Sequence, residues 1–263
     1  MEQALFIAKV EHLKYYEPRF SRIYFGNEFC QQLIPSVGDL ERVLDFVGQN
    51  NLDFTLVSPY VTDRGLEGLE PLLAATAEGK PGSEVVFNDY GVWRVLKGRY
   101  RGLSPVMGRL LNRMKRGPRL MTVIDKLPSS TVDYFRSSNL AVPVLRWFLA
   151  ESGVSRVELD NVLQGMDFNL DGLKASLYWP YAYVTTTRLC LANCGEEPES
   201  REKIGIFPCE RECRKYTFYL ENEAMPVPLI RKGNTIFFEN EALPDDMSGL
   251  GIDRIVVEPE LPI

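Results

Sequence analysis

Histidine is nearly absent from this chain, because His12 is the only one among 263 residues. A Ser-His-Asp or Cys-His catalytic unit would have to use this residue, and no motif around it points to either. A zinc hydrolase built on histidine ligands is excluded, since such sites need two or three of them. His12 lies in a segment that reads as half-exposed, so we expect a surface or boundary role for it.

Long hydrophobic runs are also missing, and none approaches the ~20 residues of a membrane span. The N-terminus has neither the basic start nor the long apolar core of a signal peptide. We therefore expect a cytoplasmic protein without a membrane span, in a compartment that keeps thiols reduced. The net charge of −6 argues against a general nucleic-acid coat but allows a local basic patch.

Cysteines are few but crowded, since four of the five fall between residues 190 and 213: Cys190, Cys194, Cys209 and Cys213. Crowded cysteines in a reducing compartment indicate metal binding or catalysis rather than core packing. Soft thiolates suit an iron–sulfur cluster or zinc. Redox-active thiols without a metal are the third alternative, and disulfides rank last because nothing indicates secretion.

The fifth cysteine, Cys30, follows the apolar run Ile23–Phe25, which reads as a buried strand that ends at Gly26. In isolation Cys30 reads as an ordinary core cysteine. The alternative is a further metal ligand brought in from a distant loop.

Strand-like and helix-like patterns alternate along the chain. Strands are expected at 22–26, 54–57, 84–87, 103–107, 156–159, 174–183, 228–231, 235–239 and 254–258. Helices are expected at 37–47, 66–77, 92–96, 132–139 and 144–152, whereas residues 1–20 fit either structure. This alternation predicts a parallel sheet in a (β/α)8 TIM-barrel-like α/β fold, complete or incomplete. A doubly wound open sheet is second, because no Gly-x-Gly-x-x-Gly follows the first strand.

We expect residues 1–263 to form one such domain, with a cysteine-rich metal-binding loop at 190–213 inserted at the C-terminal rim. Polar clusters end several expected strands: Gly26-Asn-Glu28, Ser58-Pro-Tyr60, Asn88-Asp89 and Asp160-Asn161. In a barrel these ends share the rim where active sites lie, although each cluster alone reads as an ordinary turn.

A basic segment runs from Gly108 to Arg119 and carries Arg109, Arg113 and Arg116. Such a charge run is usually a solvated face. The alternative is a substrate or partner anion site beside the rim, for which these three arginines are the candidates.

With these residues assembled, the chain resembles the collagenase-like peptidase family U-32, and especially its UbiV-like and UbiU-like iron–sulfur members. The cysteine-containing pieces carry most of the resemblance: Thr187-Arg-Leu-Cys190, Cys209-Glu-Arg-Glu-Cys213-Arg-Lys-Tyr216, and Ile23-Tyr-Phe-Gly26 through Cys30. Val85-Val-Phe-Asn-Asp-Tyr-Gly-Val92 resembles the family's third strand.

The resemblance implies a barrel that holds a [4Fe–4S] cluster. Its UbiV-like pattern maps onto Cys30, Cys190, Cys209 and Cys213, which leaves Cys194 as the alternative fourth ligand. The peptidase-like pattern is incomplete here, because no cysteine follows Cys213.

Three functions follow from these expectations. The first is an iron–sulfur protein in oxygen-independent hydroxylation or a related redox modification, paired with a second family member as a heterodimer. Its substrate would be a small anion or RNA. The second is a collagenase-like peptidase, although no nucleophile–base pair stands out. The third is a non-catalytic scaffold in which a structural metal, such as zinc, fastens the loop.

Overall fold

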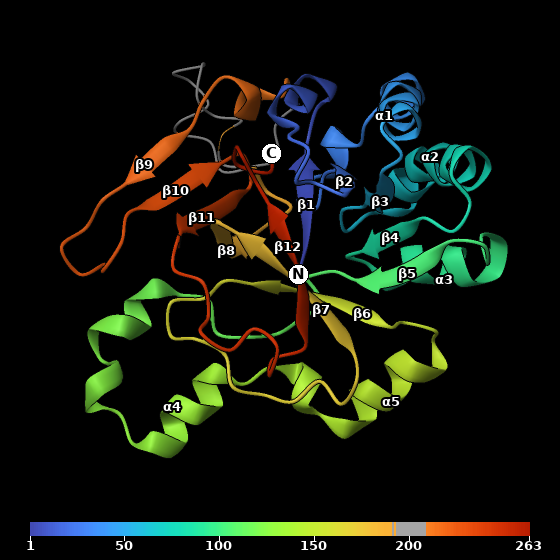
Figure 1. Cartoon of the computed structure of the whole chain (residues 1–263). Helices are drawn as coiled ribbons and strands as arrows, with labels where there is room; N and C mark the ends of the chain where they lie inside the picture. The colour runs from blue at the N-terminus through green and yellow to red at the C-terminus, as the bar shows by residue number, and fades with distance from the viewer. Residues whose placement is uncertain (191, 193–208) are drawn as a thin grey trace.

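The computed structural model describes residues 1–190, 192 and 209–263. Within them, parallel strands close into a barrel in the order β1-β12-β7-β6-β5-β4-β3-β2 (Figure 1). These strands are β1 (Glu2–Ile7), β2 (Arg22–Gly26), β3 (Asp53–Val57), β4 (Glu84–Phe87), β5 (Ser104–Met107), β6 (Arg156–Asp160), β7 (Lys174–Trp179) and β12 (Ile252–Val257). The expected TIM-barrel-like fold is confirmed, and the barrel is complete in its strands.

Helices cover part of the outside of the barrel. They are α1 (Val37–Gln49), α2 (Asp63–Gly79), α3 (Tyr90–Arg99), α4 (Ser129–Arg136) and α5 (Pro143–Glu151). The first three begin at side-chain caps, since Ser36, Thr62 and Asp89 each accept a hydrogen bond from a backbone N–H of the first turn. Residues 161–173, all of them described, connect β6 to β7 without a helix. No described helix is long and apolar enough to cross a membrane.

Alternating side chains give the barrel two apolar layers. One layer fills the barrel and consists of Ala4, Phe6, Tyr24, Val57, Val86, Val106, Tyr178 and Val256. The other lies between the strands and the helices and includes Leu5, Ile23, Leu56, Val85 and Leu159. Burial on both faces explains why the strands read as continuous apolar runs in the sequence.

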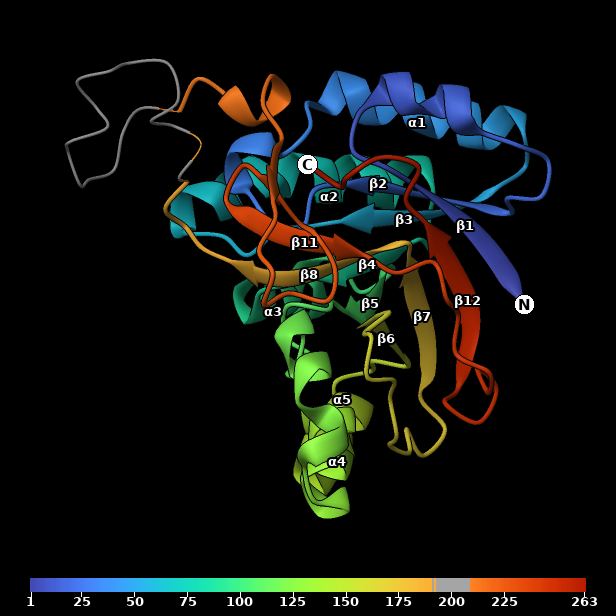
Figure 2. The same cartoon turned by 90° about the vertical axis from the view of Figure 1, so that its left-hand side faces the viewer.

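A second sheet lies outside the barrel, with the antiparallel order β8-β11-β10-β9. Its strands are β8 (Tyr181–Thr186), β9 (Phe218–Leu220), β10 (Leu229–Lys232) and β11 (Thr235–Glu239). In Figure 2, β8 and β11 cross in front of the barrel strands. The sheet packs on the C-terminal end of the barrel through Phe29, which meets Tyr183 and Phe237 edge to face.

Several sequence expectations need correction. The barrel begins at β1, inside the ambiguous segment 1–20, so the strand at 22–26 is the second one. The expected strand at 174–183 is two strands, because the chain leaves the barrel at Pro180 and enters the outer sheet as β8. The strands at 228–231 and 235–239 form an antiparallel hairpin of the outer sheet rather than barrel repeats.

Candidate functional site

The C-terminal mouth of the barrel is filled by Arg109. Its guanidinium donates to Glu28 Oε2 at 2.8 Å, to Asp160 Oδ1 at 3.2 Å and to Glu258 Oε1 at 2.6 Å. It also donates to the Tyr181 carbonyl at 3.2 Å. These partners come from the ends of β2, β6 and β12 and from the start of β8, so one side chain joins the barrel to the outer sheet.

Aromatic rings complete this Arg109 cluster, which we define as Arg109 with Glu28, Asp160 and Glu258. The guanidinium carbon lies 3.8 Å from the centroid of the Tyr178 ring and 5.3 Å from that of Phe29. The side chains of all four charged residues have no exposed surface. The usual catalytic position of a TIM barrel is therefore filled by a buried arginine and the three carboxyl groups that bind it.

The expected anion site differs from this arrangement at two of its three residues. Arg109 is buried, and Arg116 is 8% exposed and donates to Asp160 Oδ2 at 2.7 Å. Arg116 also donates to the backbone carbonyls of Arg109 and Asn112. Both charges already have partners inside the chain, so neither can attract a solvent anion. Arg113 alone of the three is exposed.

Burial raises the pKa of two carboxyl groups of the cluster, those of Glu28 and Glu258. Desolvation raises the pKa of Glu258 to about 8, although the Arg109 charge opposes the shift. Burial also raises the pKa of Glu28 against the same opposing charge. One oxygen of each, Glu28 Oε1 and Glu258 Oε2, lacks a hydrogen-bond partner among the described residues and can carry a proton.

A second ionic network closes the N-terminal end of the barrel. Arg254 donates to Glu84 Oε2 and to the Tyr24 hydroxyl, both at 2.6 Å, and to Glu2 Oε2 at 2.8 Å. The Tyr24 hydroxyl in turn donates to Glu158 Oε1 at 3.1 Å. The described barrel interior is thus a packed apolar core with charged layers at both ends.

The polar residues at the expected rim mostly serve the backbone. Asn88 donates to the Ser58 carbonyl at 2.9 Å and accepts from the Leu110 N–H at 3.1 Å. Asn27 accepts from the N–H groups of Phe29 and Cys30, at 3.0 and 2.9 Å. Asn27 therefore fixes the turn that carries Cys30 out of the barrel end.

Cys30 borders a small cavity of about 90 Å³ between the barrel and the outer sheet, together with Tyr60, Arg188 and Asn234. The Asn234 amide donates to the Phe29 carbonyl at 2.6 Å and to the Thr187 carbonyl at 2.8 Å. This one side chain ties the Cys30 turn to the segment that leads to Cys190. Arg188 lies over the Tyr60 ring, 5.5 Å from its centroid.

Cys213 contacts the turn between β10 and β11, to which Asn234 also belongs. It is buried in a short 3₁₀ helix, Glu212–Arg214, against the apolar face of the outer sheet. A Cβ at Gly233 would stand 3.0 Å from the Cys213 Cβ and 3.8 Å from its Sγ. Gly233 has φ +59°. Glycine is thus required twice here, for the left-handed turn and for the close approach to Cys213.

The structure brings Cys30, Cys190, Cys209 and Cys213 into each other's electrostatic reach, and we call this group the cysteine corner. Burial raises the pKa of Cys30 to about 11, and the nearby Cys209, Cys213 and Cys190 raise it further. Burial, together with Cys190 and Cys209, also raises the pKa of Cys213. Cys194 lies outside the described residues.

Within the described part of the chain, no three His, Cys, Asp or Glu side chains are arranged to hold a single metal ion. The donors at the cysteine corner are nevertheless all thiols, which is the donor chemistry of an iron–sulfur cluster. A cluster spaces its ligands more widely than one zinc ion does, because each thiolate binds a different iron. In donor type, the corner fits such a group.

His12 does not join either site. It is 5% exposed, and its Nε2 lies 3.4 Å from Glu260 Oε2, so the expected half-exposed surface position is wrong. Burial lowers its pKa, with Glu260 opposing the shift. His12 therefore links the segment after β1 to the segment after β12.

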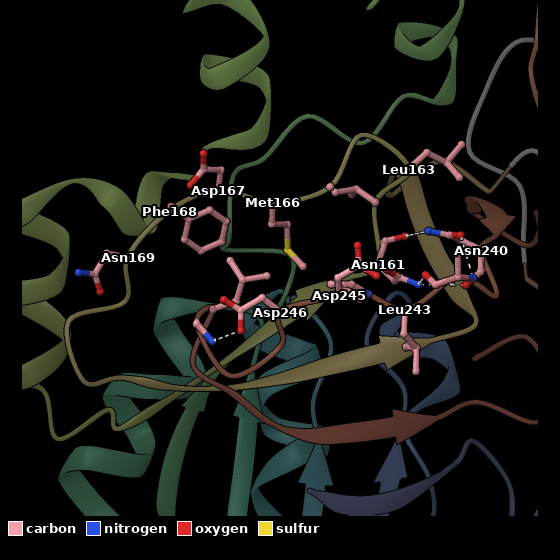
Figure 3. Close-up of a pocket in the computed structure, with 16 residues that line it drawn as sticks. Asn161, Leu163, Met166, Asp167, Phe168, Asn169, Asn240, Leu243, Asp245 and Asp246 are labelled. Atoms are coloured by element: carbon pink, nitrogen blue, oxygen red, sulfur yellow. Dashed lines mark hydrogen bonds between the residues drawn. The ribbon is translucent and has the colours of Figure 1, made fainter. Parts of the chain in front are cut away.

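A larger cavity of about 760 Å³ lies beside the barrel, between the β6–β7 loop and the β11–β12 loop (Figure 3). Asn161 spans it, since its amide donates to the carbonyls of Asn240 and Ala242 at 3.0 and 2.8 Å. Asn161 is thus the rim residue that lines an open cavity, whereas its neighbour Asp160 is sealed in the Arg109 cluster.

Comparisons with known proteins add a likeness of fold. No family model matches the chain, and no curated protein matches it. Among solved structures, the chain is similar to one titled "The Structure of the U32 Peptidase Mk0906". The identity is 11%, the TM-score is 0.47, and the match covers 100% of this chain and 94% of that chain.

Sequence reasoning missed the residues that assemble the cysteine corner. Asn234 and Gly233 belong to a Lys-Gly-Asn turn that reads only as a hairpin connection. Glu258 follows the last strand, and nothing in its neighbourhood marks it as a partner of Arg109. Of the residues that surround the corner, only Arg188 is marked in the sequence, because it belongs to the Thr187–Cys190 motif.

Proposed function

We propose that this chain is an iron–sulfur protein that binds a [4Fe–4S] cluster through Cys30, Cys190, Cys209 and Cys213. The observation that carries the proposal is the convergence of four thiols from three separate segments. Cys30 follows β2, Cys190 follows β8, and the last pair precedes β9. Burial and the neighbouring cysteines raise the pKa of Cys30 and Cys213, so these residues are stable as thiolates only when a bound cation compensates their charge.

We prefer Cys30 to Cys194 as the fourth ligand because side-chain hydrogen bonds fix the backbone around Cys30. Asn27 holds the Cys30 N–H, and Asn234 holds the carbonyl of the preceding residue. A plain core cysteine needs no such anchoring. Bound to all four residues, a cluster would tie the barrel to the outer sheet.

The role proposed for the cluster is redox chemistry, in oxygen-independent hydroxylation or a related modification. The support is the resemblance of the cysteine motifs to UbiV-like and UbiU-like members of family U-32. The cluster would supply one-electron transfer. The chain's own residues would hold the thiolates and, through Arg188, place a positive charge beside them. A second family member is the proposed heterodimer partner.

A collagenase-like peptidase is the weaker alternative. A hydrolase that activates water with carboxylates needs them within reach of the substrate. At the mouth, Glu28, Asp160 and Glu258 are fully buried and bound to Arg109. These carboxylates therefore stabilise the barrel instead of meeting a peptide.

Anaerobic purification tests the proposal. We expect about four iron and four sulfide per chain, with the broad visible absorbance of a cluster that bleaches on reduction. Stoichiometric zinc without sulfide, in protein never exposed to air, would contradict the cluster proposal. It would favour a non-catalytic scaffold with a structural zinc ion. Proteolysis of collagen or gelatin by the same preparation would instead favour the peptidase.

A further inference from the structure

A cavity of about 570 Å³ lies between the loop after β5 and helix α4. It is lined by Arg113, Met114, Lys115, Tyr134, Phe135, Ser137, Ser138, Asn139 and Val142. Its volume is in the range of about 300–1,000 Å³ that is typical of binding pockets. None of its lining residues belongs to the Arg109 cluster or the cysteine corner, so it is a separate site.

The walls of this cavity are fixed by the protein itself. The Asn139 side chain accepts from the Arg113 N–H at 2.8 Å and donates to the Leu111 carbonyl at 3.0 Å. The Gln164 amide donates to the Lys115 carbonyl at 2.6 Å. These bonds satisfy the polar groups of the wall and hold its shape, which lowers the entropic cost of binding.

Two cations stand at this wall without a countercharge. The side chains of Arg113 and Lys115 are exposed, and neither forms an ion pair with a described residue. The Lys115 ammonium lies 5.9 Å from the centroid of the Phe135 ring. Arg116, by contrast, is buried and paired with Asp160. On a chain with net charge −6, unpaired cations beside an apolar wall favour an anionic ligand with an apolar group.

Exposed apolar side chains continue from the cavity along α4 and α5, which project together from the body of the molecule (Figure 2). Tyr134 is 76% exposed, Val142 46%, Val144 67% and Trp147 65%. Single exposed hydrophobic residues are ordinary, but Tyr134 and Val142 line a preformed cavity, and Val144 and Trp147 follow Val142 at neighbouring positions of α5. A small ligand in the cavity would leave Val144 and Trp147 in water, so the surface fits a longer occupant.

We propose that this surface, which we call the α4–α5 face, binds an acidic segment of a partner protein. An aromatic or aliphatic side chain of that segment enters the cavity, and its carboxylates pair with Arg113 and Lys115. Buried apolar anchors ringed by complementary charge are the usual source of affinity at such interfaces.

A random dodecapeptide display library, selected on the full-length protein, tests the proposal without assuming a partner. We expect selected peptides to be enriched in Asp and Glu next to Trp, Phe or Leu. Their affinity should fall about tenfold or more on the double variant Arg113→Glu/Lys115→Glu, and it should weaken with salt. Tyr134→Ser should also weaken binding, but the remaining binding should keep its salt dependence, because Arg113 and Lys115 are still present.

The matched control is Arg64→Glu/Arg101→Glu, which makes the same charge change at exposed arginines elsewhere. We expect it to leave peptide affinity within about twofold, because screening isolates charges beyond about 8 Å. Selected peptides without acidic enrichment, or equal losses in both double variants, would overturn the proposal. Tighter binding of a single-stranded oligonucleotide or of 8-anilinonaphthalene-1-sulfonate than of any selected peptide would overturn it too, in favour of RNA or a small organic anion.

Discussion

The barrel mouth and the cysteine corner lie close together, but they differ in the partners of their ionisable groups. At the mouth, Arg109 meets three carboxyl groups, so its charge is partnered inside the chain. At the corner, burial and the neighbouring cysteines raise the pKa of Cys30 and Cys213. The described cations beside them include Arg188, Arg214 and Lys232.

This difference separates structure from function. Folding alone accounts for the mouth, because a buried arginine with three carboxylates joins the barrel to its outer sheet. Folding alone gives no reason to bring four cysteines together from three separate segments of the chain. We propose that a bound cluster accounts for the composition of the corner, whereas folding accounts for that of the mouth.

The largest effect is expected at the mouth. Arg109→Met should destabilise the protein by about 3–5 kcal/mol, because it removes the charged donor that binds three buried carboxyl groups and leaves them unsatisfied. Guanidinium denaturation measures the change. Arg113→Met, at an exposed position, should alter stability by less than about 0.5 kcal/mol. Similar losses of stability in the two variants would show that the contacts of Arg109 do not stabilise the barrel mouth.

The pH dependence of stability gives the next largest effect. The pKa of Glu258 rises from 4.5 to about 8 in the folded state, so the native protein holds a proton that the unfolded chain releases. This contribution is full below pH 4.5 and is lost as the pH rises to about 8, at about 1.4 kcal/mol per pH unit.

Glu258→Gln mimics the protonated carboxyl and should flatten that slope. Urea midpoints of both proteins between pH 5 and pH 9 measure it. Parallel curves for the two proteins would mean that Glu258 is ionised in the fold. Glu158, whose pKa is also raised to about 8, should keep part of the slope in the variant.

The smallest expected effect lies at the corner. Gly233→Ala should cost about 1–2 kcal/mol for its left-handed backbone and more for the approach to Cys213, and it should lower the iron content. Gly153→Ala is the matched control, because Gly153 has φ +74° and open space around it. It should show the backbone cost alone and keep its iron. Equal iron content in both variants would show that the close approach of Gly233 to Cys213 does not matter for cluster binding.

The sequence predicts the barrel well because most of its strands are buried on both faces and end at turn residues. β3, β4 and β6 appear within one residue of their expected limits. β1 is harder, since Glu2–Ile7 fits a strand or a helix until β12 pairs with it. The split at Pro180 and the antiparallel outer sheet depend on tertiary pairing, which no local pattern reveals.

The charges were harder to predict than the strands. Arg109 and Arg116 sit in a basic run that reads as solvated, but their partners are 44 to 149 residues away in the chain. Only the closed barrel brings Glu258 to Arg109. The cysteine motifs mark the corner in the sequence, whereas Asn27, Gly233 and Asn234, which shape it, read as ordinary turn residues.

The central claim is that the fold assembles an iron–sulfur site from Cys30 and three distant cysteines. The most direct measurement compares Cys30→Ser with Cys194→Ser, both purified anaerobically, for iron and acid-labile sulfide. The account predicts that Cys30→Ser loses the cluster while Cys194→Ser keeps about four iron and four sulfide per chain. A cluster retained in Cys30→Ser and lost in Cys194→Ser would contradict it, since the site would then be local to residues 190–213.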